Sequence, residues 1–184
     1  MTPTLEQAAR VLRDGGLVAY PTEGVYGLGC DPMNESAVDR LLELKQRPRA
    51  KGLILIAAAP EQLEPFLAPL EPRLRERVLA RWPGPVTWVV PAAPTTPEWV
   101  RGQHETIAVR VTAHPLAAAL CRAAGMAIVS TSANLSGHEP ARSAREVVEQ
   151  LGGRIDCVLE GALGGLDRPT EILDARTGRV LRSG

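Results

Sequence analysis

The sequence predicts an α/β fold in which a mixed sheet is flanked by helices. Segments with helical periodicity alternate with short apolar segments along the chain. Residues 53–57 are continuously apolar, as expected of a central strand that is covered on both faces. Residues 86–92 and 106–112 both have strand patterns, and an irregular loop rather than a helix separates them. These neighbouring strands, added to the alternating pattern, indicate a mixed sheet.

Length and composition indicate one globular domain over residues 1–184. The 184 residues include 45% hydrophobic and 23% charged side chains, which is enough apolar mass for a core. These values exclude a disordered, collagen-like or coiled-coil chain. The longest apolar run, residues 53–59, is too short to cross a bilayer, and the N-terminus has no signal-peptide pattern. We therefore expect a cytoplasmic protein without a membrane partner.

Charge and metal-binding residue types limit the kinds of site that the chain can form. The 21 basic and 21 acidic residues cancel, so a site for a polyanion has to be a local concentration of charge. The cysteines are far apart and lack a CxxC pair, which favours buried thiols over disulfides or a zinc site. They are Cys30, Cys121 and Cys157. The histidines lack the usual metal-binding spacings, so we expect no protein-built metal site.

Capping and breaking residues predict the first elements. Thr4 and Gln7 form a capping-box pattern that begins a helix, and Gly15-Gly16 ends it. Residues 17–22 then form a short buried strand.

A second helix begins after Asn34, which can cap it, and ends near Arg47 because Pro48 follows. Lys45 falls on the apolar face of this helix and therefore points inward, where a partly buried cation needs an anion partner. The segment 45–51, KQRPRAK, holds both lysines of the chain. The alternative is a solvated helix end, where cations are favourable in any case.

The rest of the chain continues the alternation. We expect one or two helices over residues 60–82, broken at Pro69–Pro72, and an irregular loop over residues 93–105. The remaining expected elements are a helix from Pro115 through Cys121, a strand over 127–131, a helix begun by a capping box of Ser143 and Glu146, and strands over 155–161 and 170–175.

Three polar segments lie at the ends of predicted apolar strands, where α/β proteins gather ligands. They are residues 21–29, 45–51 and 130–137. The glycines of the first segment let the backbone approach a ligand, but its pattern is neither a Walker A loop nor GxGxxG. A plain connecting loop is an equal alternative for this segment.

Two further groups of residues suit an anionic ligand. Ser130, Ser132 and Asn134 alternate, so they share a face if strand geometry persists, although capping and turns are the commoner use of such residues. Arg110 lies on the opposite face of its strand from its apolar neighbours. That face is either solvent or a cavity in which Arg110 forks onto a carboxylate. No reaction type follows from these residues alone.

Taken together, the motifs resemble those of the YrdC-like family over essentially the whole chain. The similarity lies in residues 16–23 with 26–29, Lys45-x-Arg47, Ser132-x-Asn134, 82–87, 106–111 and 169–172. The chain is most similar to the short, single-domain TsaC-type branch. This resemblance implies a twisted α/β sheet around a deep, positively lined cavity.

The resemblance also implies an activity, L-threonylcarbamoyladenylate synthesis. The implied substrates are L-threonine, bicarbonate or CO2, and ATP, with Mg²⁺ brought by the nucleotide and pyrophosphate released. Partner proteins would then transfer the threonylcarbamoyl group to tRNA. An RNA-binding module without its own catalysis is the alternative, and direct tRNA contact stays open in both cases. A carbamoylating relative is a further rival, but nothing here resembles the additional domains of such enzymes.

The resemblance carries roles onto individual positions. It implies that Lys45 and Arg47 are catalytic, and that ATP is bound by Lys45, Arg49, Thr106, Ser132 and Asn134. It implies that threonine is bound by Thr22, Arg110, Ser130 and Thr170. Two positions depart from the family pattern, Gly24 and Glu171, where relatives commonly have threonine. These departures affect the fine placement of the two loops that contain them.

Overall fold

The first helix forms where its capping residues predict it. In the computed structural model, which describes residues 3–167 and 169–183, the hydroxyl of Thr4 accepts a hydrogen bond from the Gln7 amide at 3.2 Å. The Gln7 side chain accepts one from the Thr4 amide at 2.8 Å. This reciprocal pair confirms the capping box and begins α1 (Leu5–Arg13).

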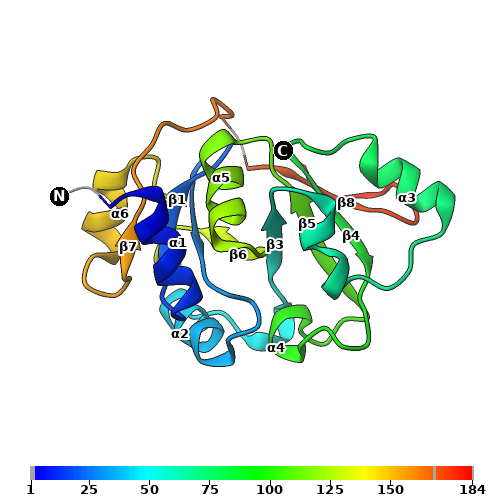
Figure 1. Cartoon of the computed structure of the whole chain (residues 1–184), viewed down its shortest axis with the longest axis horizontal. Coiled ribbons are helices and arrows are strands. Elements are labelled where there is room, and N and C mark those ends of the chain that lie inside the picture. Colours follow the sequence, from blue (N-terminus) through cyan, green and yellow to red (C-terminus); the bar gives the residue numbers. More distant parts are fainter. Residues whose placement is uncertain (1–2, 168, 184) are drawn as a thin grey trace.

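The other elements follow in the order seen in Figure 1. They are β1 (Val18–Pro21), β2 (Tyr26–Gly29), α2 (Glu35–Lys45), η1 (Arg49–Lys51), β3 (Ile54–Ala57), η2 (Pro60–Gln62), η3 (Glu64–Phe66), α3 (Pro72–Leu79), β4 (Val86–Pro91), α4 (Glu98–Arg101), β5 (Thr106–Val111), α5 (Pro115–Ala124), β6 (Ile128–Ser132), α6 (Ala144–Leu151), β7 (Cys157–Val158), β8 (Glu171–Asp174) and β9 (Val180–Arg182).

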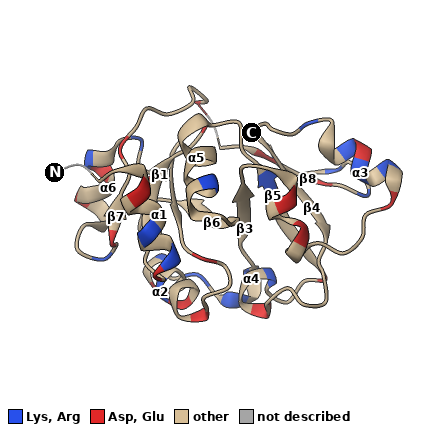
Figure 2. Ribbon diagram, in the orientation of Figure 1, with Lys and Arg blue, Asp and Glu red and all other residues tan. Residues whose placement is uncertain are grey.

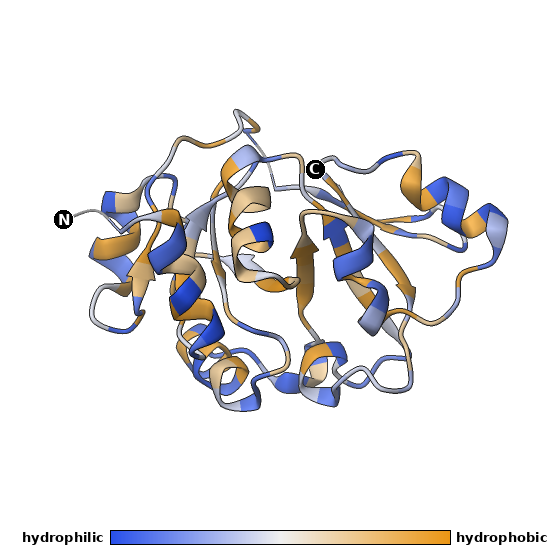
Figure 3. Ribbon diagram, viewed as in Figure 1, coloured by the Kyte–Doolittle hydropathy of each residue, from blue (hydrophilic) through white to orange (hydrophobic). Residues whose placement is uncertain are grey.

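The strands form one sheet in the order β7-β1-β2-β6-β3-β5-β4-β8-β9. The pairs β1–β7, β3–β5 and β4–β8 are parallel, and the others are antiparallel. The mixed sheet predicted from the sequence is therefore confirmed, with β3 at its centre. Figure 3 shows β3 as an apolar strand, whereas hydrophilic residues gather on the outer helices.

Helices cover the two faces of the sheet unequally. On one face, α1 and α5 pack side by side and contact Ile56 and Ile128 (Figure 1). On the other face, buried residues of α2, α3, α4 and α6 form a larger core with Leu55 and Val109. Figure 2 shows acidic and basic residues interspersed on the outer helices, in keeping with zero net charge. All three cysteines are buried and free, as expected.

Several sequence expectations need correction. Residues 60–82 contain one α-helix, α3, which begins at the expected break, but the part before the break forms two 3-10 turns because prolines interrupt the helical pattern. The loop expected over 93–105 contains the single helical turn α4. The Ser143 hydroxyl caps α6, but the Glu146 carboxylate accepts from the amide of Arg142 instead of that of Ser143, so the capping box is incomplete.

The C-terminal part also differs from expectation. The strand expected over 155–161 shrinks to the two residues of β7, and β9 was not predicted as a strand. β9 pairs with β8 at the sheet edge with its side chains largely exposed, so it lacks the apolar pattern that marks a buried strand. Among the residues that the structure describes, no helix is long and apolar enough to cross a membrane.

Candidate active site

Strand register brings polar residues of neighbouring strands to one face of the sheet. Ser130 of β6 pairs with Ile54 of β3, which in turn pairs with Ala108 of β5. Because side chains alternate along a strand, Arg110 lies on the same face as Ala108. This face is the one that α5 covers at Ile56, the β3 partner of Arg110. Beyond α5 the face is open, and a cavity of about 600 Å³ lies there.

Cations and hydroxyls dominate the polar part of the cavity lining. The cationic residues are Arg47, Lys51, Arg101, Arg110 and Arg182, and the hydroxyl residues are Thr22, Thr106, Ser130, Thr131, Ser132 and Thr170. Within residues 3–167 and 169–183, no aspartate or glutamate contributes to the lining. The cavity therefore attracts anions, although the chain as a whole is neutral.

Most residues singled out from the sequence meet in this cavity. Seven of them belong to the lining, namely Thr22, Arg47, Thr106, Arg110, Ser130, Ser132 and Thr170. Three others do not: Lys45, Arg49 and Asn134. Of the two family departures, Gly24 belongs to the lining, whereas Glu171 lies outside it and pairs with Arg81 at 3.3 Å.

Arg110 faces the cavity, which decides between the two alternatives for its strand face. It is only 4% exposed, and its Nη1 donates hydrogen bonds to the Thr170 hydroxyl at 2.6 Å and to the Thr87 hydroxyl at 3.3 Å. Its Nη2 lies 3.5 Å from Oε2 of the buried Glu23. The carboxylate beside Arg110 in this structure thus belongs to the chain itself, and sequence reasoning missed it.

The pair of Arg110 and Glu23 is incompletely hydrogen-bonded. Oε1 of Glu23 accepts a hydrogen bond from the Thr112 hydroxyl at 2.7 Å, but Oε2 has no hydrogen-bond partner. Nε of Arg110 is also buried without a partner. Buried polar atoms normally have a hydrogen-bond partner, so these two atoms can each take a further one.

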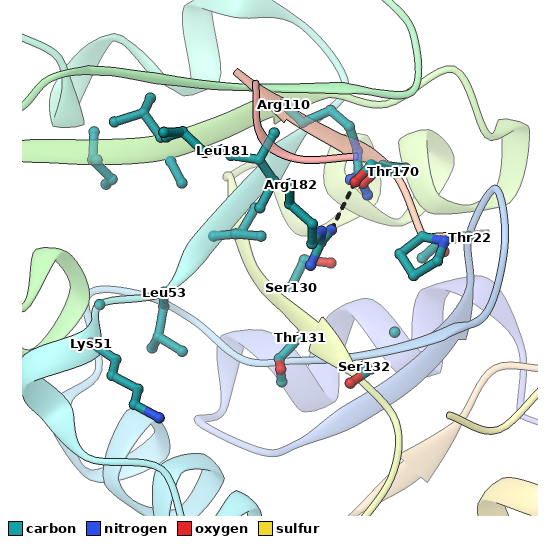
Figure 4. Close-up of a pocket in the computed structure, with 18 of the residues that line it drawn as sticks. Thr22, Lys51, Leu53, Arg110, Ser130, Thr131, Ser132, Thr170, Leu181 and Arg182 are labelled. Atoms are coloured by element: carbon teal, nitrogen blue, oxygen red, sulfur yellow. Dashed lines mark hydrogen bonds between the residues drawn. The ribbon is translucent and has the colours of Figure 1, made fainter. Parts of the chain in front are cut away.

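Arg182 is a cavity residue that the sequence did not indicate. It extends from β9, opposite Ile172 of β8, and its Nη2 donates a hydrogen bond to the Thr170 carbonyl at 2.8 Å (Figure 4). Burial and the positive charge of Arg110 lower the pKa of Arg182. Two guanidinium groups therefore share this side of the cavity, and Glu23 balances only one of them.

Lys45 points inward from α2, as its place on the apolar helix face predicts. Its Nζ donates to four oxygens at 2.6–3.3 Å, which are the carbonyl and hydroxyl of Ser132 and the carbonyl and side-chain oxygen of Asn134. All four oxygens are neutral and replace water around the ammonium group, so the expected anion partner is not among these contacts and stays a prediction. Burial, with a smaller effect of Arg47, lowers the pKa of Lys45 to about 8.

Lys45 also holds the segment after β6 in place. The Ser132 hydroxyl donates to the side-chain oxygen of Asn134 at 2.6 Å, and the Asn134 amide group donates to the His138 carbonyl at 2.6 Å. Ser130 and Ser132 share the cavity face of β6, whereas Asn134 lies beyond the end of the strand. The expected common face therefore extends over two of the three residues.

The two arginines after Lys45 have different surroundings. Arg47 is half buried, which lowers its pKa, and its Nε and Nη2 donate to the Gly52 carbonyl at 3.2 and 2.9 Å. Arg49 is exposed and pairs with Asp39 and Glu35 of α2, and the hydrogen bond to Asp39 raises its pKa. The structure does not bring Arg49 to the cavity, and its expected nucleotide contact stays a prediction.

Comparison with known proteins places these observations in a family. Residues 10–184 match the Sua5/YciO/YrdC family, which is described as a telomere recombination family. A threonylcarbamoyl-AMP synthase of Halorhodospira halophila is 59% identical over 97% of this chain and 93% of its own length. A protein of the same name from Methylococcus capsulatus is 57% identical over 97% of this chain and 96% of its own length.

The fold is similar to that of solved structures as well. The structure of P. abyssi Sua5 complexed with L-threonine superposes with a TM-score of 0.90 at 36% sequence identity. The match covers 97% of this chain and 53% of that one, so the chain spans about half of the Sua5 length.

Proposed function

The chain belongs to the Sua5/YciO/YrdC family, and we propose that within it the protein is an L-threonylcarbamoyladenylate synthase. It would join L-threonine, bicarbonate or CO2, and ATP into threonylcarbamoyl-AMP and release pyrophosphate. The observation that carries this proposal is the high identity to threonylcarbamoyl-AMP synthases over nearly the whole of both chains. The cation-lined cavity, without an acidic residue in the described part of its lining, agrees with a reaction among anions.

The reaction makes one bond in each of two steps. The threonine ammonium group loses a proton, the free amine attacks CO2, and loss of a second proton from the nitrogen gives the carbamate. A carbamate oxygen then attacks the α-phosphorus of ATP, and the bond from this phosphorus to the bridging oxygen of the β-phosphate breaks. The products are the mixed anhydride and pyrophosphate, and no side-chain nucleophile is needed. Charge grows on the phosphoryl oxygens and on the leaving group, where fixed cations lower the barrier.

The Arg110 side of the cavity suits the amino acid. Arg110 and Arg182 lie there with a net positive charge, which favours the threonine carboxylate. The hydroxyls of Thr22, Ser130 and Thr170 offer partners for its polar groups. The L-threonine complex of P. abyssi Sua5, a structural neighbour, supports this choice of substrate.

The opposite part of the cavity suits the nucleotide. We propose that Arg47 and Ser132, with Thr106 at the start of β5, contact ATP, and that Lys45 contributes by holding Ser132 and Asn134. Arg47 adds a partly desolvated positive charge, which is worth more to a phosphate than an exposed one.

A magnesium ion accompanies the nucleotide in this proposal. Mg²⁺ is normally held by carboxylates and phosphate oxygens, and the described part of the lining offers no carboxylate. The cavity therefore does not fit a Mg²⁺ ion held by the protein, and the ion would enter as part of the ATP complex.

In this proposal, a further enzyme consumes the product directly. A mixed anhydride is reactive, so we propose that proteins that transfer the threonylcarbamoyl group to tRNA consume it, in the cytoplasm. RNA binding without catalysis, the alternative from the sequence, predicts no pyrophosphate formation. A measurement of pyrophosphate release therefore separates the two functions.

The test measures pyrophosphate release from ATP with each substrate left out in turn. We expect release only when L-threonine and bicarbonate are both present, with serine a poorer substrate, and an adduct of threonine, CO2 and AMP in the mass spectrum. ATP consumption that ignores threonine, or none with all substrates present, would refute the proposed function.

A further inference from the structure

Two one-turn helices that are far apart in the sequence interlock at one edge of the cavity. The amide of Gln103, after α4, donates to the carbonyl of Ala50 in η1 at 3.2 Å, and the amide of Leu53 donates to the carbonyl of Val100 at 2.8 Å. These bonds tie the end of η1 to the end of α4. The two segments are thereby fixed relative to each other and to β3, which follows η1.

Glycines permit this contact. A Cβ atom on Gly102 would lie 2.4 Å from the Ala50 carbonyl oxygen, and one on Gly52 would lie 2.7 Å from that of Arg101. Both glycines also have positive φ, 67° and 66°. No other residue fits here without moving the backbone, so the close approach is built into the sequence.

The interlock brings three residues with basic side chains to the cavity. Lys51, Arg101 and His104 all belong to the lining, and we call them the η1–α4 rim. Nη1 of Arg101 donates to the His104 carbonyl at 2.7 Å, which fixes the turn after α4. In the described parts of the chain, no carboxylate pairs with Lys51 or Arg101. The rim therefore presents positive charge without an internal counter-ion.

We propose that the η1–α4 rim binds the β- and γ-phosphates of ATP, and afterwards pyrophosphate, through Lys51 and Arg101. This rests on the proposed function. Figure 4 shows Lys51 and Arg182 extending from different sides of the cavity, with Thr131 between them in this view. Because the α-phosphorus has to meet the carbamate near Arg110 and Arg182, the two remaining phosphates extend away from that side, toward the rim.

Lys51 and Arg101 suit phosphate binding better than Arg49 does, because neither has to leave a carboxylate of the described residues first. Arg49 would have to leave both Asp39 and Glu35 before it could meet a phosphate, and it lies outside the lining. Lys51 needs no such exchange, and its ammonium group is a compact charge suited to several phosphate oxygens in turn. The exposure of Lys51 also lets pyrophosphate leave, since contacts with an exposed charge are screened by water and salt.

The test uses the full chain without nucleotide and titrates pyrophosphate and inorganic tripolyphosphate by calorimetry. The variants are Lys51→Gln, Arg101→Gln and both together, with Arg145→Gln as a control for charge alone, because Arg145 is 87% exposed on α6 and only pairs with Glu149. We expect each rim variant to weaken binding about tenfold, the scale of one charge-assisted hydrogen bond, and the double variant about a hundredfold. The control should stay within about twofold.

Arg49→Gln tests the rival assignment in the same titration. The inference is overturned if Lys51→Gln and Arg101→Gln bind pyrophosphate as the unaltered protein does, or if Arg49→Gln loses more affinity than either. Its failure is distinguishable from that of the proposed function, because threonine-dependent pyrophosphate release by the unaltered protein is measured separately. In that assay the rim variants should raise the KM for ATP and leave the KM for threonine unchanged.

Discussion

The two sides of the cavity are built in different ways. On the Arg110 side, Arg110 belongs to β5, Glu23 lies shortly after β1 and Thr170 lies just before β8, and each of the three is less than 10% exposed. The η1–α4 rim is made of two helical turns held together through glycines, and Lys51 on it is exposed. Buried groups with fixed geometry recognise one small molecule, whereas exposed charges attract a polyanion and release it. The two sides thus match a retained amino acid and a departing phosphate chain.

The two sides also differ in their charge balance. Arg110 has Glu23 as an internal counter-ion, while the rim has none among the described residues. Removing a charge from the first side leaves the other charge buried and uncompensated. Removing one from the rim should cost ligand binding and little stability. Substitutions can therefore tell the two sides apart.

The largest effect is expected for Glu23→Gln. Glutamine keeps the shape and can still accept the hydrogen bond from Thr112, but it leaves the Arg110 charge unbalanced in a buried place. We expect the free energy of unfolding to fall by about 3–5 kcal/mol, measured by urea denaturation. Glu149→Gln, which breaks the exposed pair with Arg145, should cost less than about 1 kcal/mol.

A double variant checks the cause of that loss. Adding Arg110→Met to Glu23→Gln removes both charges, so part of the lost stability should return. Two results would contradict this explanation. One is a loss of unfolding free energy for Glu23→Gln no larger than that for Glu149→Gln. The other is a loss in the double variant equal to the sum of the losses in Glu23→Gln and Arg110→Met.

The next effect concerns Lys45, which supports the segment between the two sides. Lys45→Ala removes the group on which four oxygens of Ser132 and Asn134 converge. We expect transition-state stabilisation to fall by about 2–4 kcal/mol, measured as kcat/KM. Lys45→Arg should not restore it, because a planar guanidinium cannot replace a single nitrogen among four acceptors. Near-normal turnover of Lys45→Ala would show that the segment keeps its place without this residue.

Sequence patterns predicted the parts of the site that depend on local periodicity. The alternation of β5 put Arg110 on the face opposite its valine neighbours, and the helical period of α2 turned Lys45 inward. Both follow from geometry that a few residues define. The roles of Thr22, Thr106 and Thr170 came from family resemblance alone, because a threonine in a loop or at a strand end has no distinctive physical signal.

The parts that sequence patterns missed depend on contacts between distant segments. Glu23 lies in the turn after β1, four positions from β5 in the strand order, and meets Arg110 only in the folded chain. Arg182 enters the cavity through the register of a short edge strand with exposed side chains. The rim needs Gly52 and Gly102 to meet, which no local pattern reports. Long-range packing of this kind is set by the whole fold.

The third prediction addresses recognition on the Arg110 side. Arg110→Lys keeps the charge beside Glu23 but loses the planar donor pair that suits a carboxylate. We expect threonine binding to weaken by about 1.5–3 kcal/mol, while ATP affinity without threonine barely changes. Calorimetric titration of each ligand measures both quantities. An equal loss of the two ligands would mean that the sides do not divide the substrates.

The smallest expected effect is a shift in the pKa of Lys45, which can be measured because the chain has few lysines. With Lys45 and Lys51 as the only lysines, ¹³C-labelled lysine gives two side-chain signals, which Lys51→Gln assigns. Because burial disfavours the ammonium form, Lys45 should titrate at a pKa of about 8 rather than 10.5. The unfolded chain then binds the proton more tightly, so this residue's contribution to stability rises with pH between about 8 and 10.5.

Adding pyrophosphate to the same sample sharpens the comparison of the two sides. If the rim binds the phosphates and Lys45 contacts Ser132 rather than the ligand, pyrophosphate should perturb the Lys51 signal more than the Lys45 signal at neutral pH. A direct phosphate contact at Lys45 would reverse this order, because a nearby dianion favours the ammonium form and would raise the pKa of Lys45 toward its ordinary value. The order of the two perturbations therefore shows on which lysine the phosphate chain lies.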